Sequence, residues 1–233
     1  MTERARFELV LVRHAEPEWA RNGFNVDNPP LTERGQRQAR LLAERLAGER
    51  FDEILVSPLV RTRQTAAPVL GRLGAPEAIA PWLEEIRNPI WHGTPVEKAE
   101  AAYRADRARA SHERWEGLPG GERVSDFVAR IREASGLFLE ERGVKPLAGP
   151  LPVWSRPEPG PTGRILVVAH AGTNGVLICN LLGLEPVPWE WERFVLNHAS
   201  ITRLEAIELG DGITFSLTRL SDVEHLPGEL RTR

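Results

Sequence analysis

The feature that most constrains the fold is an alternation of short apolar strands and helices in the first part of the chain. Residues 7–12 and 51–56 are apolar and rich in β-forming side chains, which predicts two buried strands. A helix is expected after each strand, over 32–48 and from 57 to 73, and a weak third strand is expected at 78–80. Strands that alternate with helices are typical of a parallel sheet covered by helices. The sequence therefore predicts an α/β fold.

Single residues mark the ends of the two early helices. Thr32 is suited to cap the first helix, and Gly48 is placed to end it. Pro58 fits the first turn of the second helix, where its missing N–H is not needed.

The middle of the chain predicts an insertion into one domain that spans 1–233. Two helices are expected at 94–115 and 122–142. They are followed by a proline-rich loop over 143–163, which is either disordered or folded over a site. We expect 87–163 to form a helical and loop insertion that covers the site.

The last part of the chain returns to the sheet. Residues 165–169 form the strongest predicted strand, and a helix is expected at 174–182. Residues 199–207 and 213–220 predict a hairpin that closes the domain.

The composition excludes several classes of protein. The net charge of −3 gives no global positive field for nucleic acid. No apolar run approaches the roughly 20 residues needed to cross a bilayer, and the N-terminus lacks the apolar segment of a signal peptide. The single cysteine, Cys179, is expected to be a buried free thiol, which excludes a disulfide framework. We therefore expect a cytoplasmic protein with no membrane partner, and the sequence leaves a homodimer open.

Histidine and arginine side chains follow three of the predicted strands. Arg13 and His14 follow the first strand, Arg61 lies in the turn after the second, and His170 follows the late strand. In an open parallel sheet, ligands bind just beyond the carboxyl ends of the strands, so these residues can meet at one edge. Guanidinium groups grip phosphate oxygens in forked, charge-assisted pairs, and the helix after Pro58 would aim free N–H groups at the same place. The pattern predicts a phosphate site.

Five short motifs around these residues resemble those of the histidine phosphatase superfamily, also called the phosphoglycerate mutase-like family. They occur in the family's order, and they are Arg13-His14-Ala15-Glu16, Leu31-Thr32-Glu33-Arg34-Gly35 with Gln38-Ala39, Ser57-Pro58 followed by Arg61 and Gln64-Thr65-Ala66, Leu83-Glu84-Glu85 with Trp91-His92-Gly93, and Val167-Val168-Ala169-His170-Ala171-Gly172. The resemblance implies a three-layer α/β/α fold with a mostly parallel central sheet and a helical cap.

The resemblance also implies a mechanism and the residues that perform it. His14 would attack phosphorus and form a phosphohistidine, while its other ring nitrogen donates to a backbone carbonyl that the sequence does not locate. Arg13, Arg61 and His170 would bind the phosphoryl oxygens, with Ala171 among the phosphate-binding positions. Glu85 would give a proton to the leaving group. Its neighbour Glu84 is the alternative donor, and no cofactor is expected.

The chain departs from the family pattern at several positions near the expected phosphate. Ala15 and Ala171 replace glycines, and Ala20 stands where relatives often place an asparagine. Either Asn22 or Asn25 could substitute for that asparagine, and His92 replaces an acid. The candidate substrate-pocket residues are Asn22, Asn25, Glu84 and His92.

Other residues have simpler interpretations. His112, His198 and His225 are expected to be surface or packing residues, and Arg63 an exposed helical charge. No histidine pair has the i,i+4 spacing of a metal site with a carboxylate, so no metal is expected. The tryptophans at 82, 91 and 154 either pack in the core or wall the substrate site.

Three functions follow from this pattern, in order of preference. The first is a metal-independent phosphatase that hydrolyses small phosphorylated metabolites through His14. The second is a cofactor-dependent phosphoglycerate mutase, which the segment after Glu85 disfavours because it lacks the basic block of such mutases. The third is a non-catalytic module that binds a phospholigand, and such a module would not need Glu85.

Overall fold

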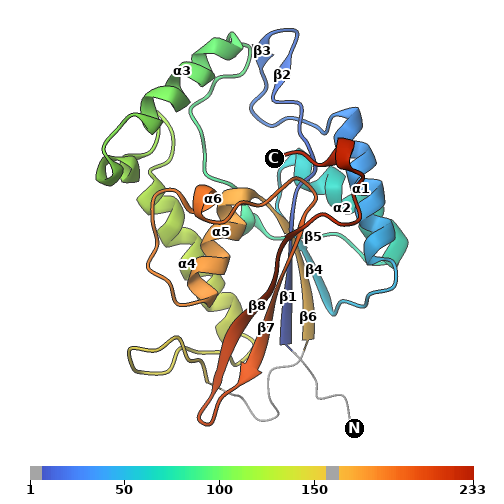
Figure 1. The fold of residues 1–233 in the computed structure, drawn as a ribbon, viewed down its shortest axis with the longest axis vertical. Coiled ribbons are helices and arrows are strands. Elements are labelled where there is room, and N and C mark those ends of the chain that lie inside the picture. The colour runs from blue at the N-terminus through green and yellow to red at the C-terminus, as the bar shows by residue number, and fades with distance from the viewer. Residues whose placement is uncertain (1–6, 156–162) are drawn as a thin grey trace.

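The computed structural model of the protein describes residues 7–155 and 163–233. Its main feature is a six-stranded sheet in the order β5-β4-β6-β1-β7-β8 (Figure 1). The first four in that order are parallel to one another, and the last two run antiparallel to their neighbours. The strands are β1 (Phe7–Arg13), β4 (Glu53–Val56), β5 (Ala78–Ile79), β6 (Gly163–Ala169), β7 (Ile201–Glu208) and β8 (Ile213–Asp222).

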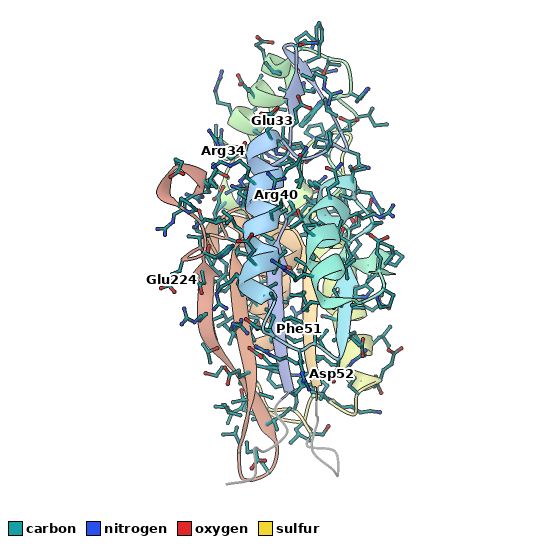
Figure 2. The ribbon with its side chains drawn as sticks, turned by 90° about the vertical axis from the view of Figure 1, so that its right-hand side faces the viewer. Glu33, Arg34, Arg40, Phe51, Asp52 and Glu224 are labelled. Carbon is teal, nitrogen blue, oxygen red and sulfur yellow. The ribbon has the colours of Figure 1, made fainter. Side chains whose placement is uncertain are left out.

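Helices cover both faces of the sheet. Side chains alternate between the two faces along each strand, and apolar side chains on both faces pack against helices. In β1, Val10 and Val12 pack in one hydrophobic core with α1 (Glu33–Leu46) and α2 (Val60–Leu73). The alternate residues of β1 pack in a second core with α4 (Val124–Glu140) and α5 (Ala171–Leu181). The view in Figure 2 shows α1 and α2 in front of the sheet. The predicted three-layer α/β/α fold with a mostly parallel sheet is therefore confirmed.

The starts of the helices differ from the predictions by a few residues. Thr32 does cap α1, since its hydroxyl accepts a hydrogen bond from the N–H of Gly35 at 2.9 Å. By contrast, α2 begins at Val60 rather than 57, because the Thr62 hydroxyl bonds the carbonyl of Ser57 and holds the preceding residues in a bend. Helix α5 begins at Ala171 instead of 174, directly after the extended His170.

A small hairpin lies between β1 and α1. It consists of β2 (Ala20–Arg21) and β3 (Phe24–Asn25). Asn22 and Gly23 form its turn with φ of 54° and 82°, the left-handed conformation that an Asn-Gly pair adopts readily in tight hairpins. The remaining short elements are η1 (Pro81–Leu83), η2 (Ser111–Glu116), α6 (Glu190–Arg193) and η3 (Gly228–Leu230).

The expected insertion over 87–163 divides into parts with different places in the fold. Helix α4 is a layer of the main domain, because Phe127 and Ile131 are fully buried in the core against the sheet. Helix α3 (Val96–Arg107) lies further out, and Ala99 is its one buried residue. Figure 1 shows α3 beyond the strand ends, near the β2–β3 hairpin.

The described part of the proline-rich loop, up to residue 155, lies away from the strand ends that carry His14 and His170. Trp154 pairs with Ile213, the first residue of β8, and its ring packs on Phe215. Phe215 in turn contacts Phe7, the first residue of β1. The described part of the loop therefore lies at the opposite end of the sheet, and residues 156–162 are outside the described residues.

Candidate active site

The two candidate histidines lie side by side at the carboxyl edge of the sheet. His14 follows β1 and His170 follows the neighbouring parallel strand β6. The N–H of His14 donates to the carbonyl of Ala169 at 2.9 Å, which ties the two strand ends together. The ring centroids are 5.2 Å apart at 62°, and both residues are buried. The sheet topology thus brings together residues that are far apart in the sequence.

A single hydrogen bond fixes the tautomer of His14. Its Nδ1 lies 2.8 Å from the carbonyl oxygen of Ala15. A carbonyl oxygen can only accept, so Nδ1 carries the hydrogen and Nε2 keeps a free electron pair. Burial, together with the positive charge of Arg61, holds the pKa of His14 well below its usual value. The ring is therefore neutral near pH 7, as a nucleophile requires.

Arg61 brings buried N–H groups to the same place. It lies in the first turn of α2, is 3% exposed, and has no hydrogen-bond partner for its Nε and Nη1 among the described residues. Burial lowers its pKa to about 10, so the guanidinium remains charged at neutral pH. A buried charged donor without a partner is costly unless a ligand satisfies it. Arg61 is therefore suited to bind an anion.

Arg13 precedes His14, and its guanidinium is held by the backbone of Leu196 and by His198. Its Nη1 donates to the carbonyl of Leu196 at 2.5 Å and its Nη2 lies 3.0 Å from His198 Nε2, while its buried Nε has no partner among the described residues. An arginine can only donate, so His198 Nε2 accepts and its Nδ1 donates to the Thr232 hydroxyl at 2.9 Å. Burial lowers the pKa of His198 to about 3. His198 was expected to be a surface or packing residue, and in the structure it is a buried residue that supports Arg13.

His170 is oriented by Ser57. Its Nε2 lies 2.7 Å from the Ser57 hydroxyl oxygen, and its buried Nδ1 has no partner among the described residues. Burial and then the charge of Arg61 lower the pKa of His170 well below its usual value, so this ring is neutral too.

Glu85 faces the same cluster from the segment after η1. Its carboxylate accepts hydrogen bonds from the N–H groups of Gly172 at 2.9 Å and Thr173 at 3.2 Å, at the start of α5. Its charge raises the pKa of both Arg13 and Arg61 against the larger effect of burial, so it lies within electrostatic reach of both. Histidines, guanidiniums and a carboxylate surround one place at the sheet edge.

Comparison with known proteins identifies the family of the chain. Residues 9–145 match the model of the histidine phosphatase superfamily, branch 1. The chain belongs to the histidine phosphatase superfamily. The resemblance inferred from the five motifs is thereby confirmed.

Relatives within the histidine phosphatase superfamily carry several names. The chain is 32% identical over 210 residues to a protein of Photorhabdus laumondii named "Probable phosphoglycerate mutase GpmB", covering 85% of this chain and 84% of that one. It is 32% identical over 186 residues to "Phosphoserine phosphatase 1" of Hydrogenobacter thermophilus, covering 76% and 77%. A solved mycobacterial glucosyl-3-phosphoglycerate phosphatase in complex with VO3 is 26% identical with a TM-score of 0.67, covering 92% of this chain and 98% of that one.

Several predicted pocket residues of this histidine phosphatase lie elsewhere. Asn22 is exposed at the tip of the β2–β3 turn, and His92 is exposed. The Asn25 amide donates to the backbone of Thr94 and Pro95, where it ties the hairpin to the segment before α3. None of these contacts joins Asn22, Asn25 or His92 to the cluster, and those of Asn25 are made with the backbone before α3.

The two remaining candidates lie at or near the site. Glu84 pairs with Arg87 at 2.8 Å, and its charge reaches Arg61. Ala171 is the first residue of α5, where backbone N–H groups have no partner within the helix.

Two aromatic residues near the site carry no signal in the sequence spacing. The Trp19 ring lies against the Arg61 guanidinium, 4.8 Å from centroid to carbon. Tyr103 of α3 remains 39% exposed, and its partial desolvation, followed by the charge of Glu85, raises its pKa, which places it within electrostatic reach of Glu85. These contacts depend on the hairpin and on α3, which are placed by tertiary packing.

The tryptophans named as candidate walls have three different surroundings. Trp91 is buried and packs edge-on against Tyr103 at 5.5 Å, next to the site. Trp82 packs on Phe138 in the core, and Trp154 lies at the far end of the sheet. Only Trp91 is thus near the site.

The described residues lack two further features: a metal-binding group and a membrane-spanning helix. Within 7–155 and 163–233, no group of three or more histidine, cysteine or acidic residues is placed to hold a metal ion. No helix in those ranges has the length and apolar character that a membrane span requires.

Proposed function

We propose that this histidine phosphatase hydrolyses small phosphomonoesters through a phosphohistidine on His14. The observation that carries this proposal is the bond from Nδ1 of His14 to the Ala15 carbonyl, which leaves a buried, neutral Nε2 free to attack. A metal ion is not needed in this scheme, because Arg13 and Arg61 supply the positive charge.

The first half of the proposed reaction transfers the phosphoryl group to the enzyme. Nε2 of His14 attacks phosphorus, the N–P bond forms, and the bond from phosphorus to the leaving oxygen breaks. Arg13 and Arg61 stabilise the charge spread over the phosphoryl oxygens, and a donor of this kind is typically worth about 3–4 kcal/mol in the transition state. The protonated form of Glu85 enters this step and gives its proton to the leaving oxygen, which departs as an alcohol.

The second half releases phosphate. The Glu85 carboxylate takes a proton from water, the water oxygen attacks phosphorus, and the N–P bond breaks. Inorganic phosphate leaves, and His14 and Glu85 return to their starting states.

In this proposal, Ser57 gives His170 the tautomer that suits a phosphate ligand. If the Ser57 hydroxyl donates to Nε2, the hydrogen of the neutral ring lies on Nδ1, which has no protein partner among the described residues. That N–H can then donate to a phosphoryl oxygen, whereas the other tautomer would present an electron pair to an anion.

The names of the relatives support phosphatase activity, but they do not agree on one substrate. One relative is named a phosphoserine phosphatase, and the solved glucosyl-3-phosphoglycerate phosphatase holds VO3. The relative named as a probable phosphoglycerate mutase favours a second candidate, in which a substrate hydroxyl replaces water as the acceptor. Phosphoryl transfer from 2,3-bisphosphoglycerate to phosphoglycerate, at a rate above its hydrolysis, would establish the mutase instead.

The test is phosphate release from p-nitrophenyl phosphate with EDTA present. We expect turnover by the parent protein and a loss of about a thousandfold or more in His14→Ala, since the nucleophile is gone. His112→Ala is the matched control, because it removes an exposed histidine of η2. Equal activity of His14→Ala and the control, or vanadate binding without any turnover by the parent, would contradict the proposal, and the latter result would indicate a phospholigand-binding module.

A further inference from the structure

The segment that carries Glu85 has no regular secondary structure to hold it. The 3₁₀ turn η1 ends at Leu83, and residues 84–90 form neither helix nor strand. A general acid must nevertheless stay within hydrogen-bond reach of the leaving oxygen. The contacts that fix this segment therefore decide whether Glu85 can work.

Arg130 of α4 binds the carbonyl groups of the two peptide bonds that flank the Glu85 side chain. Its Nη1 donates to the carbonyl of Glu84 at 2.9 Å, and its Nη2 donates to the carbonyl of Glu85 at 3.0 Å. Arg130 belongs to none of the five family motifs, and its guanidinium is directed at main-chain carbonyls. A planar guanidinium fixes the direction of each bond it makes, so it restrains the peptide as well as attracting it.

Glu122 holds the guanidinium of Arg130 in place and grips the same segment further along. Its two carboxylate oxygens accept from Nε and Nη2 of Arg130 at 2.7 and 3.0 Å. One of these oxygens also accepts from the N–H of Arg87 at 3.0 Å, and the Glu122 N–H donates to the Arg87 carbonyl at 2.7 Å. Burial opposes ionisation of Glu122, but the bonds from Arg130 and Arg87 outweigh it and lower its pKa. The carboxylate is therefore charged at neutral pH.

The backbone around Glu122 also fits closely against this segment. A Cβ added at Gly121 would lie 2.8 Å from the carbonyl oxygen of Arg87, so a side chain there would push the two segments apart. Arg130 and Glu122 are both largely buried, with 25% and 10% of their side chains exposed. The pair thus lies between α4 and the segment that bears Glu85.

We propose that Arg130 and Glu122 form a clamp that positions Glu85 for proton transfer to the leaving group. Arg130 is a positioning residue, since all three of its guanidinium nitrogens are engaged by protein oxygens behind the carboxylate. The inference rests on the proposed function, in which Glu85 is the proton donor. The clamp thus makes protonation of the leaving group depend on the contact between Arg130 and the backbone carbonyls of Glu84 and Glu85.

The test compares two phosphate esters of similar size with different leaving groups. Nitrophenolate is a stable anion that departs from p-nitrophenyl phosphate with little need of a proton, whereas the alkoxide of benzyl phosphate needs one. We compare kcat/KM for both esters in Arg130→Lys, which keeps the charge beside Glu122 but cannot reach the same set of oxygens. A purely structural defect would lower both rates by the same factor.

A matched control lies just after the C-terminal end of α4. Arg142 also combines a carboxylate partner, Glu53, with a backbone carbonyl, that of Phe138. Because Glu53 begins β4, Arg142→Lys makes the same substitution at the end of the sheet away from the site. Glu85→Gln provides the reference for complete loss of the acid.

We expect Arg130→Lys to lower kcat/KM for benzyl phosphate about tenfold more than for p-nitrophenyl phosphate, in the direction of Glu85→Gln, because a small displacement of a catalytic group costs this much. Arg142→Lys should not change the ratio of kcat/KM between the two esters.

Glu122→Gln gives a second and gentler test if Arg130→Lys folds poorly, because it keeps an oxygen for the Arg87 N–H. An unchanged ratio in both clamp variants overturns the clamp. An unchanged ratio in Glu85→Gln itself would instead overturn the proton-donor role in the proposed function.

Discussion

At the scale of single residues, the proposed reactivity of His14 depends on a contact with the next residue in the chain. The Ala15 carbonyl fixes the tautomer, and burial beside Arg61 keeps the ring neutral. The sequence predicted the residue and the need for an acceptor, but not the acceptor itself. Which carbonyl turns toward Nδ1 depends on the backbone conformation after β1, and that is not encoded in any residue type.

The same limit explains which site residues could be predicted. His14, Arg61 and His170 follow predicted strands, so the parallel sheet was enough to predict that they meet. Ser57 lies in a recognised motif, but its bond to His170 depends on side-chain direction. His198 precedes β7 at a position where the sequence shows only a polar residue, although it supports Arg13.

Gly172 offers a direct test of the placement of Glu85. A Cβ at this position would lie 2.5 Å from the Glu85 carboxylate oxygen, the free end of a flexible side chain. We therefore expect Gly172→Ala to leave the protein folded and to displace the carboxyl, with a fall of about tenfold or more in kcat/KM for benzyl phosphate. Gly136→Ala in α4 is the control, because a Cβ there meets nothing within 4 Å. Equal kcat/KM in the two variants would contradict this placement.

At the scale of elements, the alternation of strands and helices predicted the sheet and its covering helices well. The place of α4 in the core was not foreseen, because this segment was expected to belong with α3 to the insertion over 87–163. Their side chains do differ: α4 repeats apolar residues such as Phe127 and Ile131 at helical spacing, whereas α3 is rich in alanine and charge. The β2–β3 hairpin was also detectable, since Asn22-Gly23 is a strong turn signal.

The place of α4 in the core predicts a large difference between two truncations on that helix. Phe127 is fully buried, whereas Leu137 is 57% exposed. We expect Phe127→Ala to lower the free energy of unfolding by about 3–5 kcal/mol through the cavity it leaves, and Leu137→Ala to change it by less than about 0.5 kcal/mol. Urea unfolding measures both values. Similar small changes would mean that α4 is a peripheral cap.

At the scale of the whole molecule, three buried neutral histidines tie stability to pH. The pKa values of His14 and His170 lie well below their usual value, and that of His198 is about 3. Below the usual value of 6.5, the unfolded chain binds protons that these rings in the folded protein do not. Stability is therefore present above about pH 6.5 and is lost as the pH falls toward the lowered pKa values.

The expected result is a free energy of unfolding that falls between about pH 6.5 and 5, by about 1.4 kcal/mol per pH unit for each such histidine. His198→Gln should reduce this slope by the share of one histidine. Vanadate should reduce it too, because an anion beside His14 and His170 favours their protonated forms and binds only the folded state. Urea unfolding at several pH values measures the slope. A flat profile would show that these rings are not neutral and buried as described.

The molecule as a whole places its chemistry at one end of the sheet and leaves the other end for structure. The carboxyl edge carries His14, Arg61 and His170, whereas Trp154 and the described proline-rich segment pack at the opposite end. In the proposed mechanism, His14 carries the phosphoryl group at that edge during turnover.

The most direct test is to trap that intermediate. The enzyme is mixed with p-nitrophenyl phosphate, quenched in alkali, where phosphohistidine survives, and digested for mass spectrometry. We predict one phosphoryl group on the peptide that contains His14, formed in the first turnover and lost on acid treatment. A phosphoryl group on any other residue, or steady turnover by His14→Ala at the parent rate, would contradict the account.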